Sequence, residues 1–407
     1  MVERAFREGA VRMLTATSSM AAGINTPASA VIITETTRAA PGNPPMSIGE
    51  VRNMAGRAGR FGYQGAGRAI MIAESSWQRR ALVDRYVLGA PPALHSTFEA
   101  KDIPTWMIRL LRQLSRVPRN EVAALLLNSF GGYVASLCSP DFLGTVEAQV
   151  TALLARMQQE GLINEDPSGI GLTLLGKACG TASISLESCL LILGTVRRLN
   201  RQLTPEQLMA LSQIVPESDT YIPMNRRNGS PEGRWIGEAT RRFGNDVAAC
   251  LQQNAAQASD VWARAKRALI VLAYVNGTPI NRIESDFTSN ARFYGVGAGD
   301  ITGTADNSRF RLHSIFELSR IAHPAFAPPA DAMDRFFLQL ELGVPADSLD
   351  LVNAPVPLNR AACLSLRSAG ITTVDALLQS PEAMLVRLIS TAELDSIRPY
   401  LVLGQPQ

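Results

Sequence analysis

The spacing of apolar residues is the feature that most restricts the fold, because it changes character near Trp77. Before that point, apolar residues gather in short runs of the kind that form buried strands, at 11–17, 29–35 and 67–75. After it they recur every three or four residues, as on the apolar face of a helix, in stretches such as 103–115, 119–130 and 145–163. The pattern predicts an α/β region followed by mainly α domains.

Length and composition indicate a folded protein of several domains. With 407 residues, 46% apolar and 18% charged, the chain lies far from disordered compositions and suggests about two to four domains. The five cysteines are scattered and the three histidines lie far apart without Cys-x-x-Cys companions, so neither a disulfide framework nor a metal site is expected. The apolar runs are too short to span a bilayer, and residues 1–16 lack the apolar stretch of a secretory signal. We therefore expect a cytoplasmic protein without membrane contact.

Turn-rich and proline-rich segments divide the helical part of the chain. Residues 165–178 interrupt the helical spacing after three predicted helices, an order typical of a winged helix. The polar, basic segment 219–235 predicts a surface loop within a larger helical domain. Prolines within 322–332 end the next long helix, because proline has no amide donor. The expected domains are residues 1–88, 89–181, 182–330 and 331–407.

Two local patterns predict helix starts. Ser47, with Glu50 three residues later, forms the capping-box pattern at the start of a helix. Residues 171–178, GLTLLGKA, fit the phosphate-loop pattern up to Ala178, which stands where a Ser or Thr would bind magnesium. Because the four middle residues are apolar, we interpret this segment as a wing strand followed by a helix start.

The glycine-rich segment 53–69 contains three arginines and no acidic residue. On a helix, Arg57 and Arg60 would share a face that Gly56 and Gly59 leave bare. Two guanidinium groups so placed can neutralise charge on a transferring γ-phosphoryl group. The alternative is a solvated, basic helix end.

Three stretches together resemble motifs V and VI of superfamily 2 helicases. They are residues 14–33, which read as a strand, a Thr/Ser-rich turn and a second strand, then the NMAGRAGR stretch, and then the strand at 67–75. The resemblance is to the Ski-like branch, which includes the archaeal repair helicases and the helicase part of DNA polymerase theta. It implies a loop that touches both nucleic acid and nucleotide, containing Thr17, Gly23 and Asn25. It further implies that Arg57 and Arg60 reach ATP phosphates beside Gly56 and Asn53, the latter standing where the family usually has glutamine.

The nineteen residues between the two motifs, Thr34 to Arg52, contain the stretch RAAPGNPPMS. In the family that it resembles, the corresponding insertion is a β-hairpin that separates the duplex. The prolines favour a rigid turn, but the tip has no aromatic residue that would stack on a base. A plain connecting loop is the alternative.

Residues 296–322 are similar to the long ratchet helix of this family, which runs along the translocating strand. Phe310 occupies the position of an aromatic residue that stacks on a base, a contact worth roughly 1 to 3 kcal/mol. The family has an arginine two turns earlier, where this chain has Thr302 and Gly303, so Arg309 and Arg311 are the candidate substitutes. The alternative for Phe310 is an ordinary core position.

Residues 349–378 have the length and apolar pattern of a helix-hairpin-helix. A working hairpin offers glycine amides to a phosphate, whereas Pro355 and Pro357 have no amide hydrogen to donate. We therefore expect a degenerate module with reduced DNA binding, aided by Arg360 and Arg367.

The resemblance implies the remnant of a second RecA-like lobe, then a winged helix, a helical ratchet bundle and a helix-hairpin-helix-like module. No phosphate loop with a terminal Ser or Thr and no Asp-Glu pair occurs in the sequence. ATP and Mg²⁺ are thus expected only when a first RecA-like lobe, in cis or in trans, completes the site. The expected partner is single-stranded or forked nucleic acid, with DNA favoured and 3′ to 5′ movement implied. The alternatives are an ATPase-lacking nucleic-acid-binding protein and the remnant of an RNA-processing Ski-type helicase.

Overall fold

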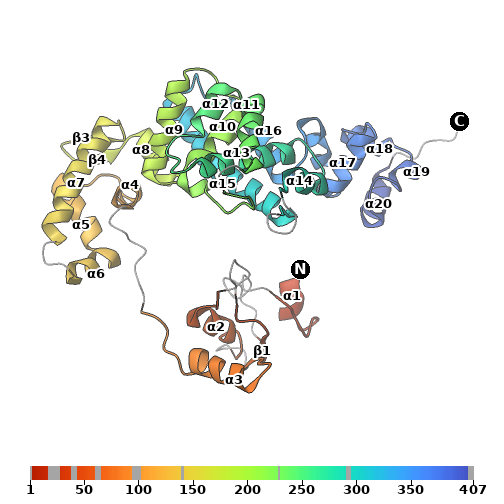
Figure 1. Cartoon of the computed structure of the whole chain (residues 1–407), viewed down its shortest axis with the longest axis horizontal. Coiled ribbons are helices and arrows are strands. Elements are labelled where there is room, and N and C mark those ends of the chain that lie inside the picture. The colour runs from red at the N-terminus through yellow and green to blue at the C-terminus, as the bar shows by residue number, and fades with distance from the viewer. Residues whose placement is uncertain are drawn as a thin grey trace. The chain divides into compact units, whose positions relative to one another are not determined.

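The structure, a computed structural model, describes residues 2–16, 28–37, 44–59, 66–93, 102–138, 142–227, 230–289 and 295–401. Two compact units make up the chain, residues 1–95 and residues 96–407. Helices predominate in the described residues, in agreement with the predicted mainly α character (Figure 1). Within these ranges, none of the helices combines the length and apolar character that a membrane crossing requires.

The first unit contains a small parallel sheet with helices. Its elements are α1 (Val2–Arg7), β1 (Ala30–Ile33), α2 (Ile48–Ala55), β2 (Arg68–Met71), α3 (Ser76–Leu82) and the π-helical turn η2 (Val83–Val87). β1 and β2 pair in parallel, with Ala30 opposite Arg68 and Ile33 opposite Met71. Helix α2 begins with the predicted capping box, in which Glu50 N donates to Ser47 Oγ and Ser47 N donates to Glu50 Oε2.

The core of this unit lies on one face of the sheet. Ile33, Val51 and Tyr86 are buried together there. On the sheet itself, Ile32 and Ile70 are 59% and 45% exposed. Because parallel sheets are normally covered on both faces, these isoleucines mark an apolar surface that the described residues leave open.

The strand expected at 11–17 is wrong for its described residues, 11–16, which have no strand structure. Met13 is 81% exposed and packs in no core. An apolar run becomes a strand only where a neighbouring strand accepts its hydrogen bonds, and β1 and β2 pair only with each other among the described strands.

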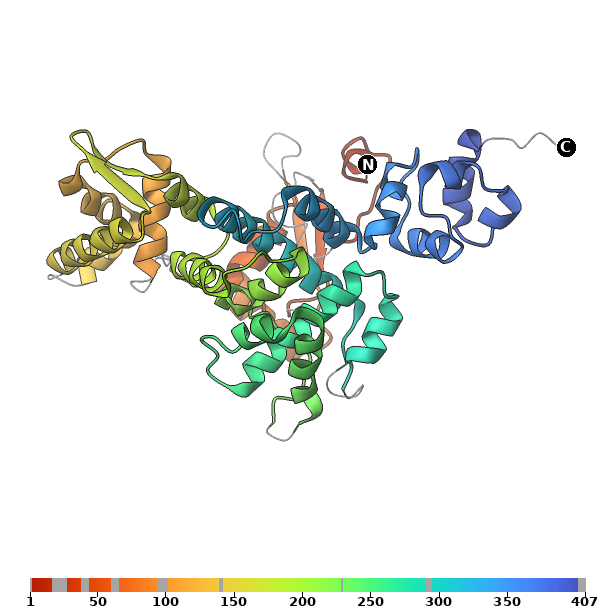
Figure 2. The ribbon, with the colours of Figure 1, turned by 90° about the horizontal axis from the view of Figure 1, so that it is seen from above.

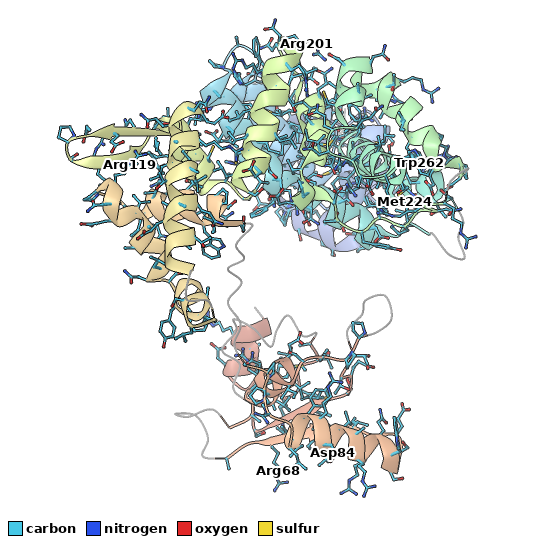
Figure 3. The ribbon with its side chains drawn as sticks, turned by 60° about the vertical axis from the view of Figure 1, so that its left-hand side comes forward. Arg68, Asp84, Arg119, Arg201, Met224 and Trp262 are labelled. Atoms are coloured by element: carbon cyan, nitrogen blue, oxygen red, sulfur yellow. The ribbon has the colours of Figure 1, made fainter. Side chains whose placement is uncertain are left out.

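The second unit begins with helices and a β-hairpin. The elements are α4 (Ile103–Gln113), α5 (Val122–Leu127), α6 (Phe130–Cys138), α7 (Phe142–Gln159), β3 (Ile163–Asp166), β4 (Gly169–Leu172) and α8 (Leu174–Thr181). β3 and β4 are antiparallel, and Val117 pairs with Ile170 as a third short edge. Figure 2 shows the two strands as a narrow hairpin beside the helices. Arg119, labelled in Figure 3, has its Nη1 2.7 Å from Glu165 Oε2, one position before the turn of the hairpin.

Residues 171–178 form the end of β4 and the start of α8, as predicted. Thr173 is the N-cap of α8, and its hydroxyl accepts a hydrogen bond from Gly176 N at 3.1 Å. A Cβ at Gly176 would lie 1.9 Å from Leu162 O, so this glycine is a packing requirement.

A helical bundle follows. It consists of α9 (Leu186–Leu199), α10 (Pro205–Leu211), α11 (Arg234–Phe243), α12 (Asn245–Cys250), α13 (Ala258–Val275), α14 (Ile280–Phe287), α15 (Ala298–Ala322) and α16 (Ala330–Leu342). α13 packs against α11, α15 and α16 (Figure 1). Most of its residues are buried. One continuous core extends from Ile103 to Leu340, so the hairpin-bearing part and the bundle share it. The predicted break at 322–332 separates α15 from α16.

The segment 219–235 is only partly the surface loop that was predicted. Ile222, Met224 and Glu232 are buried. The segment is held by charged residues of α13, which local polarity alone does not reveal.

The carboxy-terminal module has a core of its own, from Val344 to Ile397. It contains the 3₁₀ helix η8 (Ala346–Asn353), α17 (Arg360–Ser368), α18 (Val374–Leu378), α19 (Glu382–Leu385) and α20 (Thr391–Ile397). Pro355 and Pro357 lie between η8 and α17. Short 3₁₀ turns occur elsewhere in this unit: η4 (Arg119–Glu121), η5 (Ser212–Ile214), η6 (Pro216–Ser218), η7 (Pro231–Gly233) and η9 (Arg398–Tyr400).

Candidate nucleotide and nucleic-acid sites

Helix α2 ends before the arginines of the GRAGR stretch. Its last residue is Ala55, and Gly56 caps it by donating its amide to Arg52 O at 2.8 Å. Arg57 is half-buried in the turn that follows. The expectation that Arg57 and Arg60 share one helix face is therefore wrong, because Arg57 already lies outside the helix.

The backbone around Gly59 joins the two motifs. Ala28 N donates to Arg57 O at 3.1 Å, and Gly59 N donates to Ala28 O at 3.0 Å. Gly59 has a φ of +67°, and a Cβ there would lie 2.3 Å from Gly67 N. Only glycine fits such a close approach in this conformation. Ala28, within the stretch 14–33 that resembles motif V, is thus hydrogen-bonded directly to the backbone of the stretch that resembles motif VI.

The predicted nucleotide residues lie around this junction where they are described. Asn53 is exposed on α2, and Gly56 is exposed at its end. Four predicted site residues lie outside the described residues: Thr17, Gly23, Asn25 and Arg60. Their roles remain predictions.

The insertion between the motifs has an ordered base. Thr37 and Pro45 form an antiparallel bridge, and Met46 N donates to Thr36 O at 2.8 Å. The hydroxyl of the buried Tyr86 donates to Met46 O at 3.0 Å. Residues 38–43, the predicted hairpin tip, lie outside the described residues.

Phe310 is an exposed residue on a largely buried helix. Helix α15 begins where Asp300 Oδ2 accepts a hydrogen bond from Gly297 N at 2.9 Å. Further along, Ser308, Leu312 and Ile315 are buried, whereas Phe310 is 67% exposed. The core alternative for Phe310 is therefore wrong, because its ring faces outward from the bundle.

The two arginines beside Phe310 both have intramolecular contacts. Arg309 Nη1 lies 2.9 Å from Glu341 Oε2, and both side chains are partly exposed. Arg311 Nη1 donates to Asn307 O at 3.0 Å. Burial lowers the pKa of Arg311, and the nearby Glu217 carboxylate opposes this change.

Arg360 joins the carboxy-terminal module to the bundle. Its Nε donates to Gly343 O at 2.7 Å, and its Nη2 donates to Thr278 O at 2.7 Å. The guanidinium also lies over the ring of Tyr274, 4.8 Å from its centroid, and burial lowers the pKa of Arg360. These contacts give Arg360 a set of protein acceptors, and Arg367 likewise pairs with Asp347.

Replacing Arg360 by alanine is expected to lower the free energy of unfolding by about 2 kcal/mol, because the carbonyls of Gly343, Tyr274 and Thr278 lose a charged donor. Urea unfolding followed by circular dichroism measures this loss. Arg387, exposed in the same module, provides the matched alanine control. Unchanged stability combined with weaker strand binding would instead assign Arg360 to the nucleic-acid surface.

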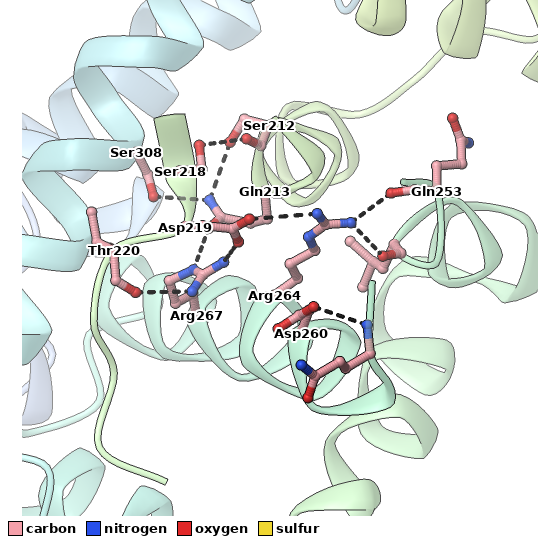
Figure 4. A network of polar contacts seen from close by, with 12 residues as sticks. Ser212, Gln213, Ser218, Asp219, Thr220, Gln253, Asp260, Arg264, Arg267 and Ser308 are labelled. Carbon is pink, nitrogen blue, oxygen red and sulfur yellow. Dashed lines mark hydrogen bonds and ion pairs between the residues drawn. The ribbon is translucent and has the colours of Figure 1, made fainter. Parts of the chain in front are cut away.

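The most conspicuous group missed from the sequence is a buried charged network on α13. Arg264, Lys266 and Arg267 are all buried. Arg264 and Arg267 pair with Asp219 (Figure 4), and Lys266 pairs with Glu232. Burial lowers the pKa of Lys266, which the Glu232 carboxylate opposes. The sequence does carry a signal for this network, namely three cations within the apolar stretch 261–275. Cations buried with such a stretch require partners elsewhere in the chain.

Comparison with known proteins relates the chain to superfamily 2 DNA helicases, which agrees with the resemblance of motifs V and VI. Relatives named ATP-dependent DNA helicase Hel308 from Caldivirga maquilingensis and Pyrococcus abyssi are each 23% identical, over 95% and 98% of this chain. A relative of the same name from Aeropyrum pernix is 40% identical over 96 residues, 23% of the chain. The chain is thus related to the carboxy-terminal region of the archaeal repair-type helicases named Hel308.

The chain spans about half the length of the first two relatives, 51% and 54% respectively. No family model matches it.

Proposed function

We propose that this chain is the carboxy-terminal portion of an ATP-dependent, 3′ to 5′ DNA helicase. It supplies arginines to a nucleotide site and a ratchet helix to the translocating strand. The observation that carries the proposal is the exposed Phe310 on the buried helix α15, in a chain related to DNA helicases over 95% of its length.

The domain assignments extend this proposal. Helices α4, α5 and α7 with the β3–β4 hairpin have the order of a winged helix, and α15 is the ratchet helix. The first unit is the remnant of a second RecA-like lobe, and the module with its core from Val344 onward is a degenerate helix-hairpin-helix.

A further polypeptide would complete the first unit. Its two parallel strands leave Ile32 and Ile70 exposed on one face, and a two-stranded sheet alone is marginally stable. A first RecA-like lobe with the rest of the second, in cis or in trans, would cover this face.

Among the described residues, Arg57 is the one that we propose to bind an ATP phosphate. Arg57 sits in the turn after α2, where Ala28 fixes its carbonyl, and its cationic side chain can bind phosphate. ATP with Mg²⁺, held mainly by the completing lobe, supplies the energy of translocation. Arg57 and Arg60 would hold the phosphate oxygens and stabilise the charge that develops on them.

Replacing Phe310 by alanine is expected to weaken binding of oligothymidylate by about 5- to 150-fold, the range for loss of one stacked base. Fluorescence anisotropy of a labelled strand measures the affinity. Phe130, 56% exposed on α6, is the matched control, because residues 122–138 contain no charge to attract a phosphate. Equal affinities of the wild type and the Phe310→Ala variant would refute a ratchet contact.

The same binding assay tests whether the chain prefers DNA or RNA. Matched oligothymidylate and oligouridylate titrations across salt separate the electrostatic contribution, which falls linearly in a double-logarithmic plot. Tighter binding of DNA at every salt concentration is expected, and preference for RNA would favour an RNA-processing relative.

A further inference from the structure

The segment 219–227, between η6 and η7, presents one exposed aromatic residue on an otherwise anchored backbone. Tyr221 is 67% exposed, whereas Ile222 and Met224 beside it are buried. Figure 3 labels Met224 among the helices of the bundle. A single exposed tyrosine is unremarkable on a flexible loop, but the contacts of this segment are not those of a flexible loop.

Two buried cations of α13 hold the backbone on both sides of Tyr221. Arg267 Nη1 donates to Thr220 O at 3.0 Å, and Lys266 Nζ donates to Pro223 O at 2.6 Å. Arg267 Nη2 also lies 2.6 Å from Asp219 Oδ1 (Figure 4). Thr220, immediately before Tyr221, and Pro223, two positions after it, are therefore held by hydrogen bonds from charged donors. Such hydrogen bonds are stronger than those between neutral groups.

Burial of these cations has an energetic cost. Taking a charged side chain out of water destabilises a protein unless partners compensate, and the Arg264 Nε atom, also buried, has no hydrogen-bond partner. What the network provides is a pre-ordered segment. A side chain already held in place loses less conformational entropy when a ligand binds.

The same network reaches the helix that carries Phe310. Arg267 Nε donates to Gln213 Oε1 at 3.2 Å, and Gln213 Nε2 donates to Ser308 Oγ at 3.1 Å (Figure 4). Ser308 lies two residues before Phe310 on α15. Tyr221 and Phe310 are thus presented by one rigid framework.

The chemistry of the segment suits an unpaired strand. Arg226 and Arg227 follow Tyr221 and are exposed, and Arg226 lies 3.3 Å from Asp260. An exposed aromatic ring and exposed cations on one short segment are a combination that can bind single strands, since every base has a π-face and every nucleotide a phosphate.

We propose that Tyr221, Arg226 and Arg227 form a second contact for single-stranded nucleic acid, distinct from Phe310. The Tyr221 ring stacks on a base, and the two guanidinium groups bind the flanking phosphates. The proposal rests on the proposed strand-binding function and adds residues to it.

The test compares three variants of the full chain with oligothymidylate. Tyr221→Ala is expected to weaken binding by about 5- to 150-fold, whereas Tyr221→Phe retains the stacking face and stays within about twofold of wild type. Tyr133→Ala is the matched control, because Tyr133 is 59% exposed on the uncharged helix α6. Circular dichroism melts verify that each variant is folded.

The arginines have a separate readout. Each lost phosphate contact on a single strand reduces the slope of log K against log salt by about 0.7. The double variant Arg226→Gln, Arg227→Gln is therefore expected to reduce the slope by about 1.4.

The outcomes separate this proposal from the proposed function. Wild-type binding by Tyr221→Ala, with weakened binding by Phe310→Ala, overturns the second contact alone. Equal losses for Tyr221→Ala and Tyr221→Phe overturn stacking, and an unchanged salt slope overturns the phosphate contacts. Failure of the wild-type chain to bind any single strand overturns both.

Discussion

Replacing Arg60 by alanine is expected to lower ATP turnover by about a thousandfold to a hundred-thousandfold, the range measured for arginine fingers. The reason is electrostatic, because the guanidinium stabilises charge on the transferring phosphoryl group. The measurement requires an assembly with a phosphate-loop lobe, such as this chain combined with the amino-terminal half of a Hel308 relative. Phosphate release then reports the turnover.

Strand binding should survive the Arg60→Ala substitution, because Arg60 is proposed to contact ATP, whereas the stacking residue Phe310 belongs to the second unit. Arg79, exposed on α3 of the same unit, provides the control arginine, and its alanine variant should turn over ATP normally. Normal turnover by Arg60→Ala would remove the finger assignment and leave a protein that binds strands without using ATP.

Replacing Glu232 by glutamine should produce the largest change in stability, about 3 to 5 kcal/mol, the usual cost of leaving a buried charge without its partner. Lys266 Nζ lies 3.7 Å from Glu232 Oε2, and both side chains are fully buried. Glu232 also accepts hydrogen bonds from the Trp235 indole and from Asn225 N. Urea unfolding followed by far-ultraviolet circular dichroism measures the effect.

Two comparisons make this result specific. Glu238→Gln, in a partly exposed pair with Arg241 and Arg242, should cost at most about 1 kcal/mol. The double variant Glu232→Gln, Lys266→Met removes both charges and should recover part of the loss. A Glu232→Gln variant as stable as wild type would contradict an energetic role for the pair.

The effect should also depend on pH. Burial acts to raise the pKa of Glu232, but its hydrogen bonds and Lys266 outweigh burial and hold the pKa below its usual 4.5. A carboxylate with a lowered pKa contributes stability above the unfolded pKa and loses it as the pH falls through the folded value. The difference between wild type and Glu232→Gln should therefore narrow in acid.

Sequence patterns a few residues long correctly predicted those helix starts that depend on neighbouring residues alone. The Ser47–Glu50 capping box and the start of α8 after Thr173 both form as expected, because each depends on residues a few positions apart. The end of α2 was not predicted, since Gly56 and Gly59 are compatible with either a helix or a turn. The positive φ of Gly59 is set by contact with Gly67, eight residues away.

Longer-range effects account for the other differences. Local polarity predicts a surface loop at 219–227. It does not reveal that Arg267 and Lys266 of α13 donate hydrogen bonds to carbonyls of this segment. Sequence alone marks Arg360 as a candidate DNA contact and does not reveal that Gly343 and Thr278 accept its hydrogen bonds. In each case a cationic side chain donates a hydrogen bond to a carbonyl that is distant in sequence. The periodic spacing of apolar residues carries no information about such a pairing.

The close approach of Gly59 and Gly67 has a consequence for engineering. A Cβ at Gly59 would lie 2.3 Å from Gly67 N, and a Cβ at Gly67 would lie 2.2 Å from Gly59 N. The turn after α2 and the start of β2 therefore meet at a point where neither backbone leaves room for a side chain. Variant libraries of the first unit should keep both glycines fixed, because an alanine at either position would push these two backbones apart.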